Sequence, residues 1–288
     1  MKLLEKFNRT FTEKEVSEAV AKTKESSKSM FTPEYLKLAF STIDLTSLNS
    51  SDTYKKIAEM TQKVNEFKNN FPEMPNVAAI CVYPNFVQTV RKNLSVSGIN
   101  LASVTGGFPS SQTFLEIKTK ETRLCMQRGA DEVDMVISVG EFLGEDYPYI
   151  HHEVKKIKQS SESGHLKVIL ETGLLENYDK IYKASILAMS GGGDFIKTST
   201  GKEKIGSTPE AVYVMCCAIK DYYEETNKKI GLKPAGGIST PDISLHYLAI
   251  VKQVLGEDWL NNKFYRTGAS SLANKLLSAI YEKEINYF

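Results

Sequence analysis

Residues that bind metals or form disulfide bridges are scarce in this sequence. It has four cysteines and four histidines among 288 residues, and no two cysteines have the C-x-x-C spacing. Cys216 and Cys217 are adjacent and do not brace a fold, so we expect a reduced protein in the cytoplasm. His151 and His152 are also neighbours and would point to different sides of a helix. We therefore expect neither a metal nor another cofactor.

Long apolar runs and an excess of one charge are also absent. No stretch of about eighteen apolar residues occurs, which predicts no membrane span. The first six residues lack an apolar core of signal-peptide length. The 36 Lys and Arg residues nearly balance the 35 Asp and Glu residues, leaving a net charge of +1. No broad attraction to nucleic acid or to an anionic membrane is expected, so any phosphate binding must be local.

Glycine motifs that bind nucleotides are missing as well. No G-x-G-x-x-G follows the first apolar run, which disfavours an open dinucleotide-binding sheet. A P-loop is excluded at Gly201-Lys202, because Ile196 stands where that motif needs its first glycine.

The sequence does contain a regular alternation of short apolar runs with segments of helical spacing. Eight runs are predicted as strands: Ala39–Leu45, Val77–Tyr83, Leu101–Thr105, Glu132–Val139, Leu166–Glu171, Asp194–Thr198, Ile230–Pro234 and Phe264–Thr267. Eight strand–helix units in about 250 residues predict a closed (β/α)8 TIM barrel. We assign it to residues 39–288, and we expect residues 1–38 to be a short helical N-terminal extension packed on the barrel.

Two lysines lie in the apolar runs of the sixth and seventh predicted strands. Lys197 belongs to Asp194–Lys202, and Lys233 to Gly231–Gly237. At neutral pH only about one ordinary lysine in two thousand is the reactive amine. Burial and a neighbouring cation both lower the pKa of a lysine. We therefore interpret Lys197 as an amine nucleophile that Lys233 helps to keep unprotonated; the alternative is that each lysine extends to solvent or pairs with a carboxylate.

Two acids also lie inside apolar strands. Asp134, in the fourth, is predicted either to relay protons through a water or to pair with a lysine for structure. Asp44, in the first, would hold the Lys233 ammonium, and Thr46 would donate to a substrate hydroxyl; the alternative is a polar strand end that leads into a turn.

Glycine and serine follow each of the last three predicted strands. Barrels often bind phosphate in these loops through backbone N–H groups at a helix N-terminus. Ser270 or Ser271 would cap the last helix and donate to a phosphate oxygen, and Lys202 would add a charge. Ordinary turn chemistry explains any one loop alone, but three adjacent loops indicate a site. The residues concerned are Gly201, Lys202, Gly236, Gly237, Ser270 and Ser271.

Taken together, these stretches resemble the deoxyribose-phosphate aldolases, Schiff-base aldolases built on a (β/α)8 barrel. The resemblance covers roughly residues 40–275. It is carried by Asp44–Thr46, Ala78–Pro84, Gly129–Asp134, Leu166–Gly173, Phe195–Lys202, Lys233–Gly237 and Gly268–Leu272.

The resemblance implies reversible cleavage of 2-deoxy-D-ribose 5-phosphate to D-glyceraldehyde 3-phosphate and acetaldehyde. Lys197 would form the imine, Lys233 would lower its pKa, Asp134 would move protons with a water, and Asp44 would orient Lys233. The phosphate end would be held by Thr200, Gly201, Lys202, Gly236, Gly237, Ser270 and Ser271.

Some questions stay open at this stage. A related imine-forming aldolase could use a different phosphorylated sugar, selected near Thr46 and Leu48. A barrel could also bind a partner protein through residues 1–38 or an exposed apolar strip. Some family members end in a tyrosine that closes over the site, and here Tyr287 is penultimate. A homodimer and a homotetramer are both compatible with the sequence.

Overall fold

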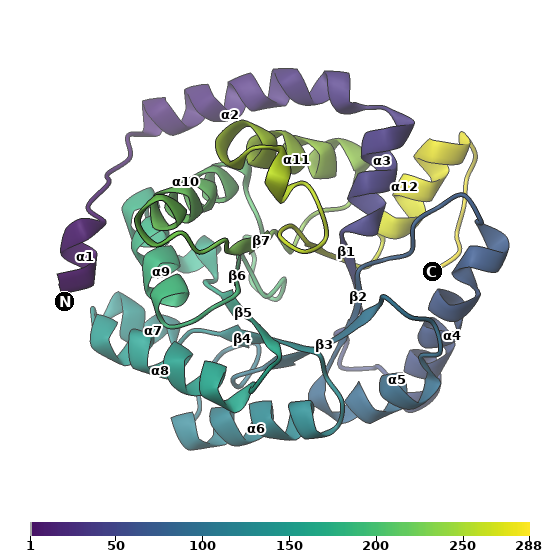
Figure 1. The fold of residues 1–288 in the computed structure, drawn as a ribbon, viewed down its shortest axis with the longest axis horizontal. Coiled ribbons are helices and arrows are strands. Elements are labelled where there is room, and N and C mark those ends of the chain that lie inside the picture. Colours follow the sequence, from purple (N-terminus) through teal and green to yellow (C-terminus); the bar gives the residue numbers. More distant parts are fainter. Residues whose placement is uncertain (1) are drawn as a thin grey trace.

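Eight parallel strands form the centre of the computed structural model, which describes residues 2–288 (Figure 1). The strands are β1 (Ile43–Thr46), β2 (Ala79–Val82), β3 (Asn100–Thr105), β4 (Glu132–Val136), β5 (His165–Ile169), β6 (Phe195–Lys197), β7 (Gly231–Lys233) and β8 (Thr267–Ala269). Their order is β7-β6-β5-β4-β3-β2-β1-β8. Parallel bridges Leu232–Tyr265 and Ala235–Gly268 connect the two ends. The structure thus confirms the predicted (β/α)8 barrel.

Helices surround the strands (Figure 1). They are α1 (Lys2–Lys6), α2 (Glu13–Ser27), α3 (Pro33–Ser41), α4 (Tyr54–Asn70), α5 (Val87–Asn93), α6 (Leu115–Gln127), α7 (Val139–Leu143), α8 (Tyr147–Ser160), α9 (Tyr178–Ser190), α10 (Pro209–Thr226), α11 (Pro241–Leu255) and α12 (Leu272–Tyr281). Several begin at a threonine whose hydroxyl accepts a first-turn N–H, as Thr53, Thr208 and Thr240 do. The apolar face of α4 is buried at Ile57, Val64 and Phe67, which recur at helical spacing.

The first and last strands differ from their predicted ranges. Ala39–Ser41 belong to α3, which Thr32 caps, and Leu36, Ala39 and Phe40 are buried at helical spacing. The assigned boundary between residues 38 and 39 therefore falls inside a helix. At the other end, β8 begins at Thr267 rather than at Phe264. Before pairing with β1 begins, Phe264 and Arg266 make backbone hydrogen bonds to Leu232 of β7.

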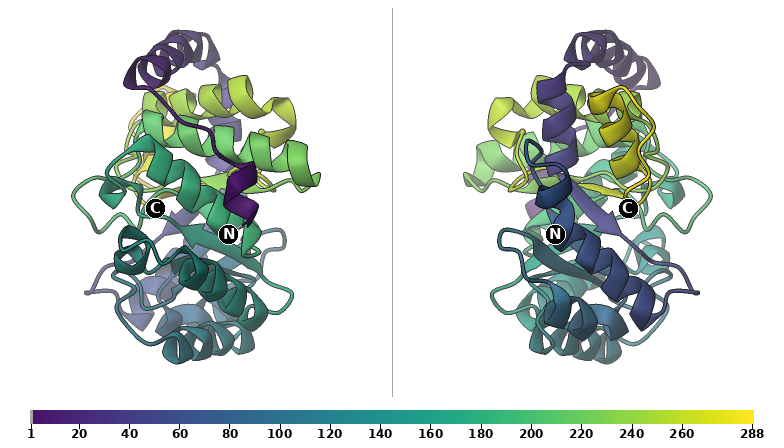
Figure 2. Two further views of the ribbon diagram at one scale, coloured as in Figure 1. Left: turned by 90° about the vertical axis from the view of Figure 1, so that its left-hand side faces the viewer. Right: turned by 90° about the vertical axis from the view of Figure 1, so that its right-hand side faces the viewer.

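The N-terminal segment lies against the outside of the barrel. Figures 1 and 2 show α2 outside α10 and α11. Val16 and Val20 of α2 are buried, and Thr23 Oγ1 lies 3.0 Å from Nε2 of His246 on α11. Met1 of the predicted extension lies outside the described residues.

The C-terminal tail is held between α4 and α12, where Asn274 bonds to Tyr287 and Phe288. Tyr287 Oη donates to the Lys63 carbonyl at 2.8 Å, and the ring of Phe288 stacks on Phe67. Across residues 2–288, no helix combines the length and apolar character needed to cross a membrane.

Candidate active site

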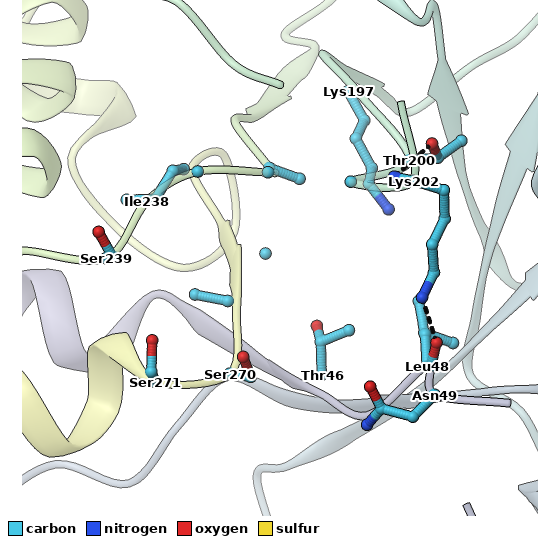
Figure 3. A pocket seen from close by; sticks show the side chains of 16 residues that line it. Thr46, Leu48, Asn49, Lys197, Thr200, Lys202, Ile238, Ser239, Ser270 and Ser271 are labelled. Carbon is cyan, nitrogen blue, oxygen red and sulfur yellow. Dashed lines mark hydrogen bonds between the residues drawn. The ribbon is translucent and has the colours of Figure 1, made fainter. Parts of the chain in front are cut away.

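One cavity opens at the carboxyl ends of the strands, where barrel active sites gather. Its volume is about 310 Å³. The loops after β1, β6, β7 and β8 line it, and Lys197 extends into it (Figure 3). The lining residues include Thr46, Leu48, Asn49, Lys197, Thr200, Gly201, Lys202, Gly236, Gly237, Ser270 and Ser271. Most of the predicted site residues therefore share one cavity.

Lys197 is the last residue of β6 and has an exposed fraction of 3%. Its Nζ atom donates to Asp134 Oδ2 at 2.9 Å. Burial lowers the pKa of Lys197, the Asp134 carboxylate raises it, and the nearby Lys233 ammonium lowers it again, so that the net shift is downward. This is the direction that increases the population of the reactive amine.

Lys233 ends β7 directly beside Lys197, since the two residues are partners in the β6–β7 register. Its Nζ atom lies 2.7 Å from Asp134 Oδ2 and 2.5 Å from Asp44 Oδ2. Burial alone would lower the pKa of Lys233, but Asp134 and Asp44 raise it to a value well above the ordinary one. Lys233 is therefore a fixed positive charge at the base of the cavity.

Asp134 joins the two lysines. Its Oδ2 atom accepts from both of them, and its Oδ1 atom accepts from Lys167 at 3.1 Å. Burial would raise the pKa of Asp134, but the neighbouring lysines, Lys167 foremost, hold it well below its usual range. Asp134 is thus an ionised carboxylate within hydrogen-bond distance of three lysines.

Three further charged residues extend this cluster, and sequence reasoning assigned none of them. They are Glu132 on β4, Lys167 on β5 and Arg266 just before β8. Lys167 Nζ lies 2.5 Å from Glu132 Oε2, and Arg266 reaches both Glu132 and Asp44. Strand alternation gives one signal for Glu132, because it lies two residues before Asp134 and therefore faces the same side.

The loops after β6 and β7 touch through glycine. Gly201, Gly236 and Gly237 have φ values of +75°, +84° and +79°, which favour glycine. A Cβ atom added to Gly236 would lie 3.2 Å from the Gly201 Cα atom. The backbones can approach this closely because neither residue has a side chain.

Other polar groups at the rim already have partners. Lys202 Nζ donates to the Leu48 carbonyl, as Figure 3 shows. The Thr200 hydroxyl donates to Glu171 at 2.5 Å, and the Thr46 hydroxyl donates to the Asp44 carbonyl at 2.7 Å. Tyr287 does not line this cavity. Within the described residues 2–288, no group of three or more His, Cys, Asp or Glu side chains is arranged to hold a metal ion.

The (β/α)8 barrel and the cavity with two buried lysines at its strand ends are those of a barrel enzyme. The chain belongs to the DeoC/LacD family of aldolases, whose family model matches residues 38–256. The resemblance found in the sequence is thereby confirmed.

Individual relatives agree with this assignment. A Caenorhabditis elegans protein is 42% identical over 94% of this chain and 90% of its own length. Human deoxyribose-phosphate aldolase is 39% identical over 86% of this chain and 81% of its own length. The solved deoxyribose phosphate aldolase of Aeropyrum pernix has the same fold, with a TM-score of 0.68, 22% identity, and coverage of 91% of this chain and 97% of that one.

Proposed function

We propose that this chain reversibly cleaves 2-deoxy-D-ribose 5-phosphate to D-glyceraldehyde 3-phosphate and acetaldehyde through an imine on Lys197. The supporting observation is that one cavity contains both a buried amine of lowered pKa and glycine and serine loops suited to phosphate. Membership of an aldolase family and the names of its relatives point to the same reaction.

The amine chemistry needs no metal. Lys197 Nζ attacks the aldehyde carbon C1 of the open-chain sugar, and loss of water leaves a protonated imine that acts as an electron sink. The C3 hydroxyl then loses its proton, the C2–C3 bond breaks, and its electron pair forms an enamine on Lys197. Protonation at C2 and addition of water release acetaldehyde and regenerate the amine.

Asp134 and Lys233 serve the proton transfers in this scheme. The Asp134 carboxylate contacts the nucleophile directly at 2.9 Å, and the Lys233 ammonium shares the same oxygen atom. A water held by Asp134 carries protons to and from the carbinolamine and the sugar. Asp44 keeps the Lys233 ammonium in place from its other side.

The phosphate is proposed to bind at the opposite end of the cavity. Ser270 and Ser271 precede α12, where free backbone N–H groups and the helix dipole favour an anion. The Gly201 and Gly236–Gly237 backbones provide further N–H groups, and Lys202 adds a charge. Thr200 supports this loop through Glu171, and Thr46 contacts a sugar hydroxyl.

Trapping of the imine tests the proposal. Borohydride added with acetaldehyde should attach a two-carbon group to Lys197, detected by peptide mass spectrometry. The K197M variant should lose the label, whereas K202M should keep it, although both lysines line the same cavity. Labelling at another residue, or none in the wild type, would contradict the proposed nucleophile.

Substrate choice is tested separately. A panel of phosphorylated sugars and donor aldehydes should show highest kcat/KM with 2-deoxy-D-ribose 5-phosphate and acetaldehyde. Preference for a larger donor would indicate a related imine-forming aldolase, with selection near Thr46 and Leu48.

Residues 1–38 are proposed to be a stabilising extension of the barrel. The buried Phe7 stacks on Tyr222 of α10, and the Phe11 N–H donates to Asp179 of α9 at 2.9 Å. Deletion of residues 1–31, which keeps α3 and its Thr32 cap, should lower Tm and leave the KM of the remaining folded enzyme unchanged. An unchanged Tm with loss of a captured partner would favour a binding role instead.

We also propose a homodimer or a homotetramer. Phe114, Ile117 and Leu124, at and along α6, have exposed fractions of 78%, 52% and 37%. The Aeropyrum pernix relative is described as tetrameric. Light scattering should give a mass of two or four chains, and an F114S/I117S double variant should reduce it. A wild type that stays monomeric would reject this proposal.

A cytoplasmic location is proposed from the cysteines. All four are free thiols in the interior of the molecule, and reducing compartments preserve such thiols. Cell fractionation tests this location; recovery in an oxidising compartment would contradict it.

A further inference from the structure

Seven charged side chains form one continuous buried network beneath the cavity. Ion pairs of 4 Å or less connect its members, and each has an exposed fraction of 4% or less. The carboxylates are Asp44, Glu132 and Asp134, and the bases are Lys167, Lys197, Lys233 and Arg266.

The network has one base more than it has acids. A buried group of charges is costly unless its members neutralise one another. Three carboxylates balance three cations, so the fourth base is best accommodated without its proton. Lys197 is the base at the edge of the network, where its ion-pair contact is with Asp134 alone, whereas Lys233 and Arg266 each contact two carboxylates.

We propose that Arg266 is a positioning residue that sets the charge state of Lys197: it supplies a permanent third cation, so that Lys197 is the base left as a free amine. This inference rests on the proposed function, because it explains how that function's nucleophile is prepared. Arg266 acts from below and is not among the residues that line the cavity.

The geometry of Arg266 suits this role. One terminal nitrogen lies 2.7 Å from Asp44 Oδ1, and the other lies 2.9 Å from Glu132 Oε1. A guanidinium keeps its charge at any pH relevant to an enzyme, unlike a buried lysine. Asp44 uses its other oxygen to hold Lys233, so Arg266 also fixes the acid that orients the second lysine.

The pKa directions agree with this charge balance. Among the four bases, only Lys197 has a lowered pKa, because its burial and the Lys233 ammonium outweigh the Asp134 carboxylate. The carboxylates raise the pKa of Lys167, Lys233 and Arg266 despite their burial. The neighbouring cations lower the pKa of all three carboxylates, again despite burial.

Other titratable groups nearby do not alter the count. Burial raises the pKa of the Cys81 thiol on β2, so it stays neutral. Glu171, after β5, is satisfied by the N–H and hydroxyl of Thr200 and makes no ion pair with the network. His165 lies 3.6 Å from Glu132, but its side chain is 55% exposed. Lys202 is at the rim, where it donates to the Leu48 carbonyl.

Three variants with opposite expected signs test the proposal. R266M leaves the network one positive charge short, so Lys197 should hold its proton to higher pH. E132Q leaves one negative charge fewer, so Lys197 should lose its proton at lower pH. The R266M/E132Q double variant restores the balance. One unit charge in a buried site shifts a neighbour by roughly one pH unit, or about tenfold in free amine at a fixed pH.

The measurement is the initial rate of borohydride trapping with acetaldehyde at Lys197, followed from pH 5 to 10 beside the acid limb of kcat/KM. We expect the midpoint to move up in R266M, down in E132Q and back toward wild type in the double variant. R266K should move the midpoint less than R266M does, because its ammonium supplies the third positive charge only while it stays protonated. Loss of packing alone would not produce shifts of opposite sign.

The role of Arg266 would be overturned if R266M and E132Q had the same trapping midpoint as the wild type. It would also be overturned if the midpoint moved in the same direction in both single variants. If R266M fails to fold, the shift in E132Q and its reversal in the double variant decide the question. The proposed function fails separately: wild-type protein that is not trapped at Lys197 rejects the nucleophile, whereas a trapped wild type with unshifted variants rejects only this inference.

Discussion

Replacing Lys233 with methionine removes the fixed charge beside the proposed nucleophile. The two lysine Nζ atoms lie 2.9 and 2.7 Å from the same oxygen, Asp134 Oδ2. They are therefore no farther apart than about 5.6 Å, the sum of those distances. At an effective dielectric constant of about 20, two unit charges at that separation repel by about 3 kcal/mol.

That repulsion corresponds to roughly two pH units in the titration of Lys197. In K233M the Asp134 carboxylate also attracts the Lys197 proton without competition from a second ammonium. We expect the acid limb of kcat/KM to move about two units toward alkaline pH, with about a hundredfold loss at neutral pH. Activity should recover substantially as the pH is raised.

The assay is a pH profile of kcat/KM from pH 5 to 10 with the phosphorylated sugar. K202M is the matched control, because it removes a lysine from the same cavity that makes no contact with Asp134. It should raise KM and leave the limb in place. An acid limb in K233M that stays at the wild-type position, or moves to lower pH, would refute the reasoning.

Three further predictions follow from the same contacts. K197M should abolish turnover yet fold normally by circular dichroism and Tm, because it removes an uncharged base; a large fall in Tm would show that a charge was lost. Folding lowers the pKa of Asp134 and Glu132, so both carboxylates stabilise the folded state. That stabilisation is fully present above the pKa of the unfolded chain, about 4, and is lost as the pH falls toward the pKa of the folded state. Calorimetry should therefore give a steep fall in Tm below about pH 4; a Tm independent of pH there would contradict these directions. G236A should raise KM for the phosphorylated sugar about tenfold more than G237A. Both positions have positive φ, but only an added Cβ at Gly236 meets the neighbouring loops, so equal effects would argue against close loop contact.

The order of the barrel elements could be predicted from the sequence because each strand is a short apolar run, and the segments between the runs have apolar residues at helical spacing. The errors in the predicted bounds of the first and eighth strands have local causes. Ala39 and Phe40 are apolar enough to suit a strand, but Thr32 and Pro33 start a helix that includes them. Tyr265 pairs with β7 through a single bridge, so its apolar run precedes the eighth strand instead of forming it.

The lysine pair was predictable for a different reason. Neighbouring parallel strands end at the same edge, so two strand-end lysines on β6 and β7 had to meet there. Arg266 gave no such signal, because its partners Asp44 and Glu132 lie 222 and 134 residues away and meet it only when the barrel closes. Charge balance across the interior depends on that closure and cannot be read from any one strand.

The most direct test of the account is the titration of Lys197 itself. Lysine labelled with ¹³C at Cε would be followed by NMR from pH 5 to 11, and the Lys197 signal would be assigned by its absence in K197M. The account predicts a Lys197 midpoint well below the ordinary lysine pKa of about 10.4. The Lys233 Cε signal should keep the chemical shift of a protonated lysine throughout. A Lys197 midpoint at or above the ordinary value would contradict the central claim.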